Sequence, residues 1–190
     1  MFENIEKRVN NTKFLLIIVA SVFALDQLTK YAARFFLEPV QQVSVLGNFF
    51  RLTYVENPGI AFGIRINNKV LFTILTLAAV IAIFYYLFKI KGHWSLRLAF
   101  AVILGGAFGN LIDRFTYGVV VDFFDFDFFN LTLPSFHFLF FDFQGYPMDR
   151  WPVFNIADTA VSIGMILIIL NAIFDRSPKQ TENDAPAEEI

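Results

Sequence analysis

The sequence contains no cysteine and only two histidines, His93 and His137. The lack of cysteine excludes thiolate catalysis, disulfides and thiolate metal sites, and two histidines leave almost no ligands for zinc. Charge is scarce as well, because only 17% of the 190 residues are charged and the net charge is −2. A chain without a basic excess is not expected to bind nucleic acid.

Apolar residues take the place of the missing charge. They make up 56% of the chain, and the mean hydropathy is +0.56. Soluble domains contain about 45–50% apolar residues and about 25% charged ones. A soluble fold of this length cannot bury so much apolar surface, so much of it must face lipid. The composition therefore predicts a polytopic membrane protein.

Four apolar stretches are long enough to cross a bilayer, which requires about 20 residues per helix. They cover about 14–37, 70–88, 96–112, and from 155–158 to 174. The first is an alternative candidate for a cleaved signal peptide, because Lys7, Arg8 and Lys13 precede its apolar run. Its apolar character resumes after the polar residues at 26–30, which favours a retained helix.

Basic residues predict the orientation of the four spans. Segments 1–13, 89–97 and 175–190 hold eight Lys or Arg in 38 residues, whereas 38–69 and 114–153 hold five in 72. Because basic loops stay inside, the termini and the short loop are expected in the cytoplasm. Both long loops then face outward, and the polar tail 175–190 is expected to be disordered.

The two outer loops differ in character. Residues 43–55 alternate in a way that favours short strands. The second loop contains ten phenylalanines in the 21 residues from Phe123 to Phe143. Such a segment is expected to lie in the membrane interface or to cover an apolar surface.

Polar residues near the hydrocarbon region are costly and are therefore functional candidates. The four-span topology gathers nine of them near the outer face: Asp26, Lys30, Asn57, Asn110, Asp113, Arg114, Asp122, Asn155 and Asp158. A structural role at a helix end is the alternative for any one of them. Asp158, for example, is also suited to capping the fourth helix.

Three of these residues are candidates for paired-carboxylate chemistry. Peptide hydrolysis without a nucleophilic serine or cysteine or a metal needs two carboxyl groups that share a proton. Asp122 has apolar neighbours, which raise the pKa of a carboxyl and suit an acid. Asp158 begins a helix, whose positive end favours ionisation. This asymmetry favours a dyad of Asp122 and Asp158, but the residues alone leave Asp113 open.

Four segments carry a resemblance to a known family: DQLTK at 26–30, GNFFRLTYVENPGIAFG at 47–63, GGAFGNLIDRFTYGVVVDF at 105–123 and FNIADTAVSIG at 154–164. The chain resembles the lipoprotein signal peptidases (signal peptidase II), which are bacterial membrane aspartic peptidases. The resemblance implies a membrane all-α fold with four transmembrane helices, a small periplasmic β-cradle and a short extracellular helix after Asn57. Residues 1–174 are then one integral-membrane peptidase domain, with a Phe-rich insertion at about 124–150 and a cytoplasmic tail at 175–190.

The resemblance also implies an activity and a site. The family removes signal peptides from diacylglyceryl-modified prolipoproteins, cutting on the amino side of the lipidated cysteine. Asp122 and Asp158 match its catalytic pair. The residues that match supporting or substrate-binding positions are Asp26, Lys30, Asn57, Gly59, Asn110, Asp113, Arg114 and Asn155. The expected setting is a monomer in the bacterial inner membrane, in contact with lipids, without metal, cofactor or nucleic acid, and with its active site at the outer face.

The sequence departs from the family pattern in two places. The usual NTGAAF is NPGIAF, which changes the loop at Pro58 and Ile60. Asp122 and Asp158 are 36 residues apart, whereas the family has about 18. The Phe-rich insertion accounts for the difference. We expect it to form either an interfacial lid over the acyl chains of the substrate or an elaborated membrane anchor.

Two other functions remain as alternatives. A small proton-coupled transporter would use the same carboxylates as a relay, but it would need acidic residues near mid-membrane and on both sides. An inactive homologue would bind lipidated peptides without cutting them. The retention of Asp122 and Asp158 argues against the inactive homologue.

Overall fold

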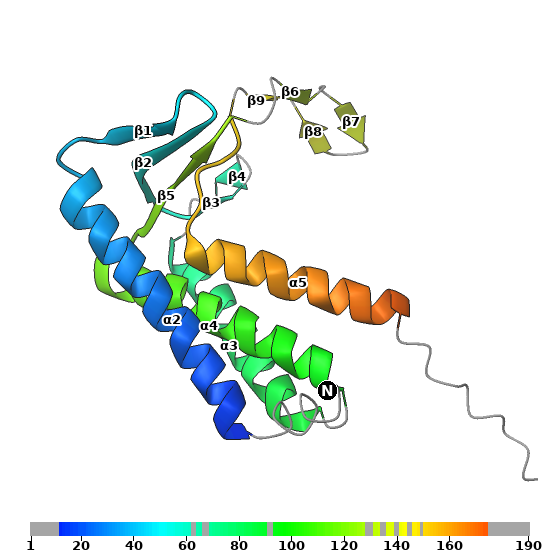
Figure 1. Ribbon diagram of the computed structural model, residues 1–190. Helices are drawn as coiled ribbons and strands as arrows, with labels where there is room; N and C mark the ends of the chain where they lie inside the picture. Colours follow the sequence, from blue (N-terminus) through cyan, green and yellow to red (C-terminus); the bar gives the residue numbers. More distant parts are fainter. Residues whose placement is uncertain are drawn as a thin grey trace, which may run out of the picture.

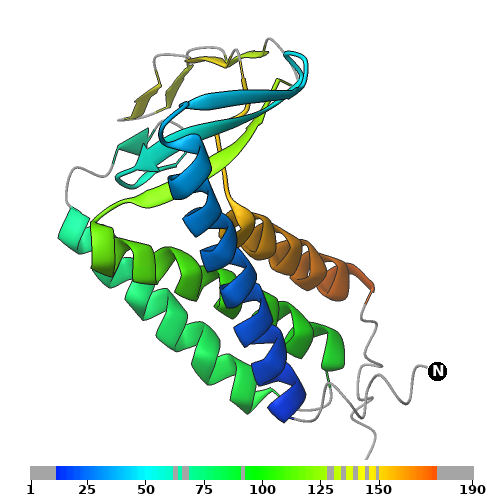
Figure 2. The same ribbon diagram turned by 60° about the vertical axis from the view of Figure 1, so that its left-hand side comes forward.

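The computed structural model describes residues 12–61, 64–65, 69–90, 93–127, 131–133, 136–138, 141–143, 146–148 and 150–174. In this part of the chain the helices are α2 (Thr12–Ala32), α3 (Lys69–Lys89), α4 (Trp94–Tyr117) and α5 (Ile156–Phe174). A π-helical turn, η1 (Ala33–Leu37), continues α2. The helices gather below a small sheet, which lies at the C-terminal end of α2 (Figures 1 and 2).

The helices match the four predicted apolar stretches. Among the described residues, three segments are long and apolar enough to cross a membrane: Thr12–Leu37, Trp94–Tyr117 and Ile156–Phe174. The apolar part of α3, Thr73–Lys89, is shorter. The described part of the molecule is therefore mostly helical, with three candidate spans and a small antiparallel sheet, which is consistent with a membrane protein.

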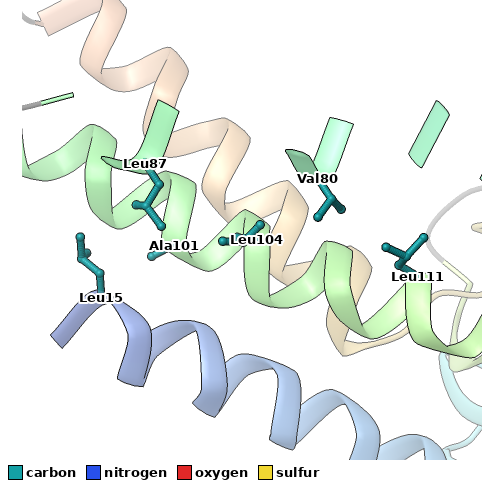
Figure 3. Close-up of a cluster of buried hydrophobic side chains, with 6 residues drawn as sticks. All are labelled: Leu15, Val80, Leu87, Ala101, Leu104 and Leu111. Atoms are coloured by element: carbon teal, nitrogen blue, oxygen red, sulfur yellow. The ribbon is translucent and has the colours of Figure 1, made fainter. Parts of the chain in front are cut away.

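Helix α4 is the centre of the bundle and packs against α2, α3 and α5. One buried cluster joins Leu15 of α2 and Leu87 of α3 to Ala101 and Leu104 of α4 (Figure 3). The outward faces are also apolar: on α5, Ile169 is 56% exposed. Helices that are apolar all round are typical of membrane spans.

Gly105 and Gly109 allow close packing of α2 on α4. A Cβ atom at Gly105 would lie 2.7 Å from the Cβ of Val22. A Cβ atom at Gly109 would overlap the carboxylate of Asp26. Small residues allow helix backbones to approach closely in membranes, and these two glycines have that role here.

The main sheet has the strand order β1–β2–β5 and is antiparallel, with β1 at Gln42–Leu46, β2 at Phe50–Asn57 and β5 at Val120–Phe126. The alternating pattern at 43–55 predicted the first two strands, but β5 was not predicted. Gly118 makes β5 possible, because it ends α4 with a φ of 73° and donates its N–H to Arg114 O at 3.1 Å. The chain then turns directly into the sheet.

The segment after Asn57 differs from the expected extracellular helix. Its described residues form two short paired strands, β3 (Ile60–Ala61) and β4 (Ile64–Arg65). Pro58 and Gly59 interrupt β2 at this point, and Gly59 has a φ of 111° that glycine readily adopts. The isoleucines that follow are β-branched, which favours strand over helix.

The Phe-rich insertion forms nested antiparallel pairs. Strand β6 (Leu131–Leu133) pairs with β9 (Tyr146–Met148), and β7 (Phe136–Phe138) pairs with β8 (Phe141–Phe143) between them. These strands lie at the sheet end of the molecule, away from the helices (Figures 1 and 2). The tail expected at 175–190 lies outside the described residues.

Candidate active site

Asp122 lies in β5 and is almost completely buried, with 2% exposure. The register of the sheet places Asp122 opposite Val55 and places Val120 opposite Asn57. Asn57 Nδ2 consequently donates to Asp122 Oδ2 at 3.0 Å. The other carboxylate oxygen, Oδ1, accepts from Asn155 Nδ2 at 2.6 Å.

Asp158 lies in the first turn of α5, three residues after Asn155. Asp158 N donates to Asn155 Oδ1 at 2.9 Å, and Asn155 N donates back to Asp158 Oδ2 at 3.3 Å. This reciprocal pair is the arrangement of a capping box. Asn110 Nδ2 donates to Asp158 Oδ1 at 2.8 Å. Asn155 is therefore the N-cap of α5, whereas Asp158 is the third residue of the helix, completes the capping box and also faces the polar cluster.

Asn155 connects the two carboxylates. It is fully buried, and its side-chain amide reaches Asp122 on one side while its carbonyl holds the backbone N–H of Asp158 on the other. The same Nδ2 lies 3.2 Å from Asn110 Oδ1 and 3.3 Å from Val121 O. One asparagine thus fixes the relative positions of β5, α4 and α5 at the point where the aspartates meet.

The environment of Asp122 favours its protonated form. Burial raises the pKa of Asp122 to about 7, and the negative charge of Asp158 contributes to the increase. The hydrogen bonds from Asn57 and Asn155 act in the opposite direction and limit the rise. The sequence predicted a raised pKa from the apolar neighbours of Asp122, and this prediction is confirmed.

A second group of charged residues is fully buried and contacts the residues that hold Asp158. Lys30 Nζ lies 2.8 Å from Asp26 Oδ2 and 2.9 Å from Asp113 Oδ2. It also donates to Asn110 Oδ1 at 2.7 Å. Asp26 Oδ1 in turn accepts the backbone N–H of Ala157 in α5 at 2.9 Å. Lys30 thus joins α2 to the residues that hold Asp158.

Arg114 and Gly59 complete the predicted set. Arg114 Nη1 donates to Asn110 O at 3.2 Å, and its charge acts on Asp158, Asp122 and Asp113. It also lines a cavity of about 410 Å³ beside α3. The N–H of Gly59 donates to Asn57 Oδ1 at 2.9 Å, which orients the Asn57 amide toward Asp122.

All ten predicted residues therefore take part in one contiguous polar network. Sequence reasoning missed Gln27, whose Nε2 bonds to Asp26, to Gly109 O and to Asp113. Its position in a polar pair with Asp26 was the available signal. Sequence reasoning also missed Arg150 and Asp125, which are ion-paired at 2.6 Å. No local pattern joins these two, because they lie 25 residues apart.

Comparisons with known proteins give the family. Residues 18–174 match the family model described as Signal peptidase (SPase) II. The lipoprotein signal peptidase of Moorella thermoacetica is 40% identical over 154 residues, 80% of this chain and 88% of that protein. That of Caldanaerobacter subterraneus subsp. tengcongensis is 40% identical over 159 residues, 84% and 95% of the two chains.

A solved structure agrees with the sequence comparisons. A bacterial membrane enzyme determined by the in meso method at 2.3 Å resolution superposes with a TM-score of 0.68 at 30% identity. The match covers 94% of this chain and 95% of that one. The polar network described above lies within the matched region, and the chain belongs to the signal peptidase II family.

Proposed function

We propose that this chain removes signal peptides from diacylglyceryl-modified prolipoproteins, with Asp122 and Asp158 as the catalytic pair. The observation that supports this proposal is the double contact of Asn155, which binds the buried carboxylate of Asp122 and the backbone N–H of Asp158. Two carboxyl groups with different environments are what aspartic hydrolysis needs. The bond cut is the one on the amino side of the lipidated cysteine.

The two aspartates have different roles in the proposed reaction. Asp158 is the base, and its carboxylate oxygens accept from Asn110 Nδ2 and from the backbone N–H of Asn155. It removes a proton from a water that attacks the scissile carbonyl. Asp122 is the acid and gives its proton to the carbonyl oxygen as the tetrahedral intermediate forms. When the C–N bond breaks, the leaving amine takes the proton that Asp158 received, and the product carboxyl returns one to Asp122.

The supporting residues are proposed to fix this geometry rather than to react. Lys30 and Asp26 position α5 through Ala157, and Asp113 is the carboxylate that balances the charge of Lys30. Arg114 faces the aspartates beside a cavity and is a candidate substrate contact. Gly59 and Asn57 hold the sheet side of the site.

The membrane arrangement is part of the proposal. Helix α3 packs along α4 and is the fourth span, so both termini lie on the same side. The basic residues place that side in the cytoplasm of a bacterial cell and place the sheet at the outer face of the inner membrane. We propose one domain over 1–174, with the Phe-rich insertion acting as a lid or as an anchor, and a monomeric state in contact with lipids.

Cleavage of a purified substrate tests the function. The full chain in lipid or detergent is mixed with a diacylglyceryl-modified prolipoprotein, and cleavage is followed by gel shift and by the mass of the products. We expect cleavage before the modified cysteine, and no cleavage of the same prolipoprotein without its lipid. Binding of the lipidated substrate without cleavage would contradict the proposal and favour the inactive homologue.

The pKa of Asp122 predicts the pH dependence of cleavage. Below about pH 7 Asp122 is protonated and able to donate, and above it the group is ionised, so kcat/KM falls as pH rises through this range. Replacing Asn57 by alanine removes a hydrogen bond that lowers the pKa of Asp122, so the fall moves to higher pH. Asn171→Ala, at a contact with Ser95 elsewhere on α5, is the control that leaves the profile in place. A shift to lower pH in Asn57→Ala would contradict the assignment of the acid.

A further inference from the structure

Arg150 lies at the C-terminal end of the Phe-rich insertion and contacts residues at its N-terminal end. Its Nε donates to Asp125 Oδ1 at 2.6 Å and its Nη2 donates to Asp125 O at 3.2 Å. Its Nη1 reaches Asp127 Oδ2 at 3.2 Å and Asn48 O at 2.9 Å. Asp125 is 4% exposed and also accepts from Thr53 Oγ1 at 2.7 Å. The guanidinium of Arg150 therefore joins the C-terminal end of the insertion to its N-terminal end and to the turn between β1 and β2.

The backbone next to Arg150 runs alongside β5. Trp151 N donates to Phe126 O at 2.9 Å, and Phe154 and Phe124 exchange N–H···O bonds at 3.1 and 2.8 Å. The rings of Phe126 and Phe154 are stacked with centroids 5.9 Å apart. The next residue after this segment is Asn155, which contacts Asp122. Any movement of residues 150–154 away from β5 is thus transmitted directly to the link between the two aspartates.

We propose that Arg150 is a positioning residue that holds Asp122 and Asp158 in register across their 36-residue separation. The inference rests on the proposed function of the two aspartates. Charge-assisted hydrogen bonds between arginine and carboxylate are strong, and Arg150 adds a second bond to the backbone carbonyl of Asp125. Lengthening a loop adds little to its closure cost. The contact between Arg150 and Asp125, called the clamp below, is therefore sufficient to compensate for the longer connection.

Substitutions at the clamp test this role through the separation of kcat from KM. A displacement of about 1 Å costs up to about 100-fold in rate, so Arg150→Ala and Asp125→Ala should each lower kcat by about 10- to 100-fold with KM within about twofold. The double variant should be no worse than either single one, because both remove the same contact. Arg150→Lys keeps the charge without the fork and should be intermediate.

Asp127→Asn is the matched control. Asp127 meets the same guanidinium, but its side chain is 37% exposed, compared with 6% for Asp125, and the contact is longer. Its kcat should stay near that of the wild type. All rates are taken per folded enzyme, well below the midpoint of thermal unfolding. If Arg150→Ala does not fold, Arg150→Lys and the shortened chain described next carry the test.

A shortened chain separates positioning from general stability. Residues 128–149 are replaced by a tight Asn-Gly turn, which joins the entry and the exit covalently. With Arg150 present, we expect kcat to be retained. In the shortened chain, Arg150→Ala should lower kcat by less than about threefold, because the short loop itself holds the two ends of the insertion together.

Three outcomes would overturn the clamp: an equal loss from Arg150→Ala in the long and short chains, an effect on KM alone, or an inactive short chain that still folds. The dyad variants separate this from the function itself. If Asp122→Asn and Asp158→Asn leave cleavage intact, the proposed function fails, and the positioning role fails with it. If they abolish cleavage and Arg150→Ala does not lower kcat, only the clamp is rejected.

Discussion

Asparagine in place of Asp122 or Asp158 is expected to lower kcat for cleavage of a diacylglyceryl-modified prolipoprotein by about 10⁴-fold or more. Each substitution keeps the size of the side chain and removes the ability to exchange a proton. Asn at 122 still accepts from one neighbouring amide, so the local packing survives. Because the two groups act as one unit, the double variant should be scarcely worse than either single variant.

Asp113→Asn distinguishes this pair from the third carboxylate. Asp113 is ion-paired with Lys30 at 2.9 Å and with Arg34 at 3.7 Å, so its loss should act chiefly on stability. Gel-shift rates for the three variants, measured side by side on folded protein, decide the assignment. Normal cleavage by Asp122→Asn together with a dead Asp113→Asn would show that the pairing is wrong even though the family stands.

Lys30→Met is expected to have the largest effect on stability. It leaves Asp26 buried without its cation and leaves Asp113 only the longer contact with Arg34. Breaking a buried ion pair by removing one partner costs about 3–5 kcal/mol in the free energy of unfolding. Unfolding in detergent, followed by helical circular dichroism, measures the change. Methionine matches the length of the lysine side chain, so packing is largely preserved.

Two companion variants make the result specific. Lys89→Met, at the exposed end of α3 where the ammonium lies 5.2 Å from the ring centroid of Tyr85, should change stability by less than about 0.5 kcal/mol. Adding Asp26→Asn and Asp113→Asn to Lys30→Met should restore much of the loss, because no uncompensated charge then remains. Wild-type stability in Lys30→Met alone would show that the buried ion pairs contribute nothing.

Much of the fold follows from composition, and the reason is physical. A helix that crosses a bilayer needs a long apolar run, so hydropathy predicts the helices at 14–37, 70–88, 96–112 and 155–174. Polar residues are costly in the bilayer, so the polar residues around Lys30 and Asn155 were recognised as candidates because they interrupt or flank these runs. Apolar and other residues alternate at 43–55, and this pattern predicted β1 and β2 because successive side chains of a strand point to opposite faces.

Strand β5 and the Arg150 clamp were not predictable in the same way. The segment VVVDFFDF is nearly continuous in apolar residues, and such a run does not distinguish strand from helix or interfacial loop. Arg150 contacts Asp125 only because residues 151–154 lie alongside β5. The pairing of these residues with β5 arises in the folded structure and has no local pattern in the sequence. The strands after Asn57 were missed because the family resemblance suggested a helix where this chain has Pro58 and β-branched residues.

The contact between Asp26 and Ala157 has a consequence for biosynthesis. The two residues are 131 positions apart, so the acceptor on α2 is made long before its donor on α5. During translation Asp26 can pair with Lys30, which lies one turn away in the same helix, so the two charges are already balanced when α2 enters the bilayer. Helix α5, which is synthesised after α2, α3 and α4, then supplies Asn155 and Asp158 together. With Asp122 and Asp158 as the proposed catalytic pair, cleavage cannot begin until the ribosome has completed α5, so the order of synthesis delays proteolysis until these helices are assembled.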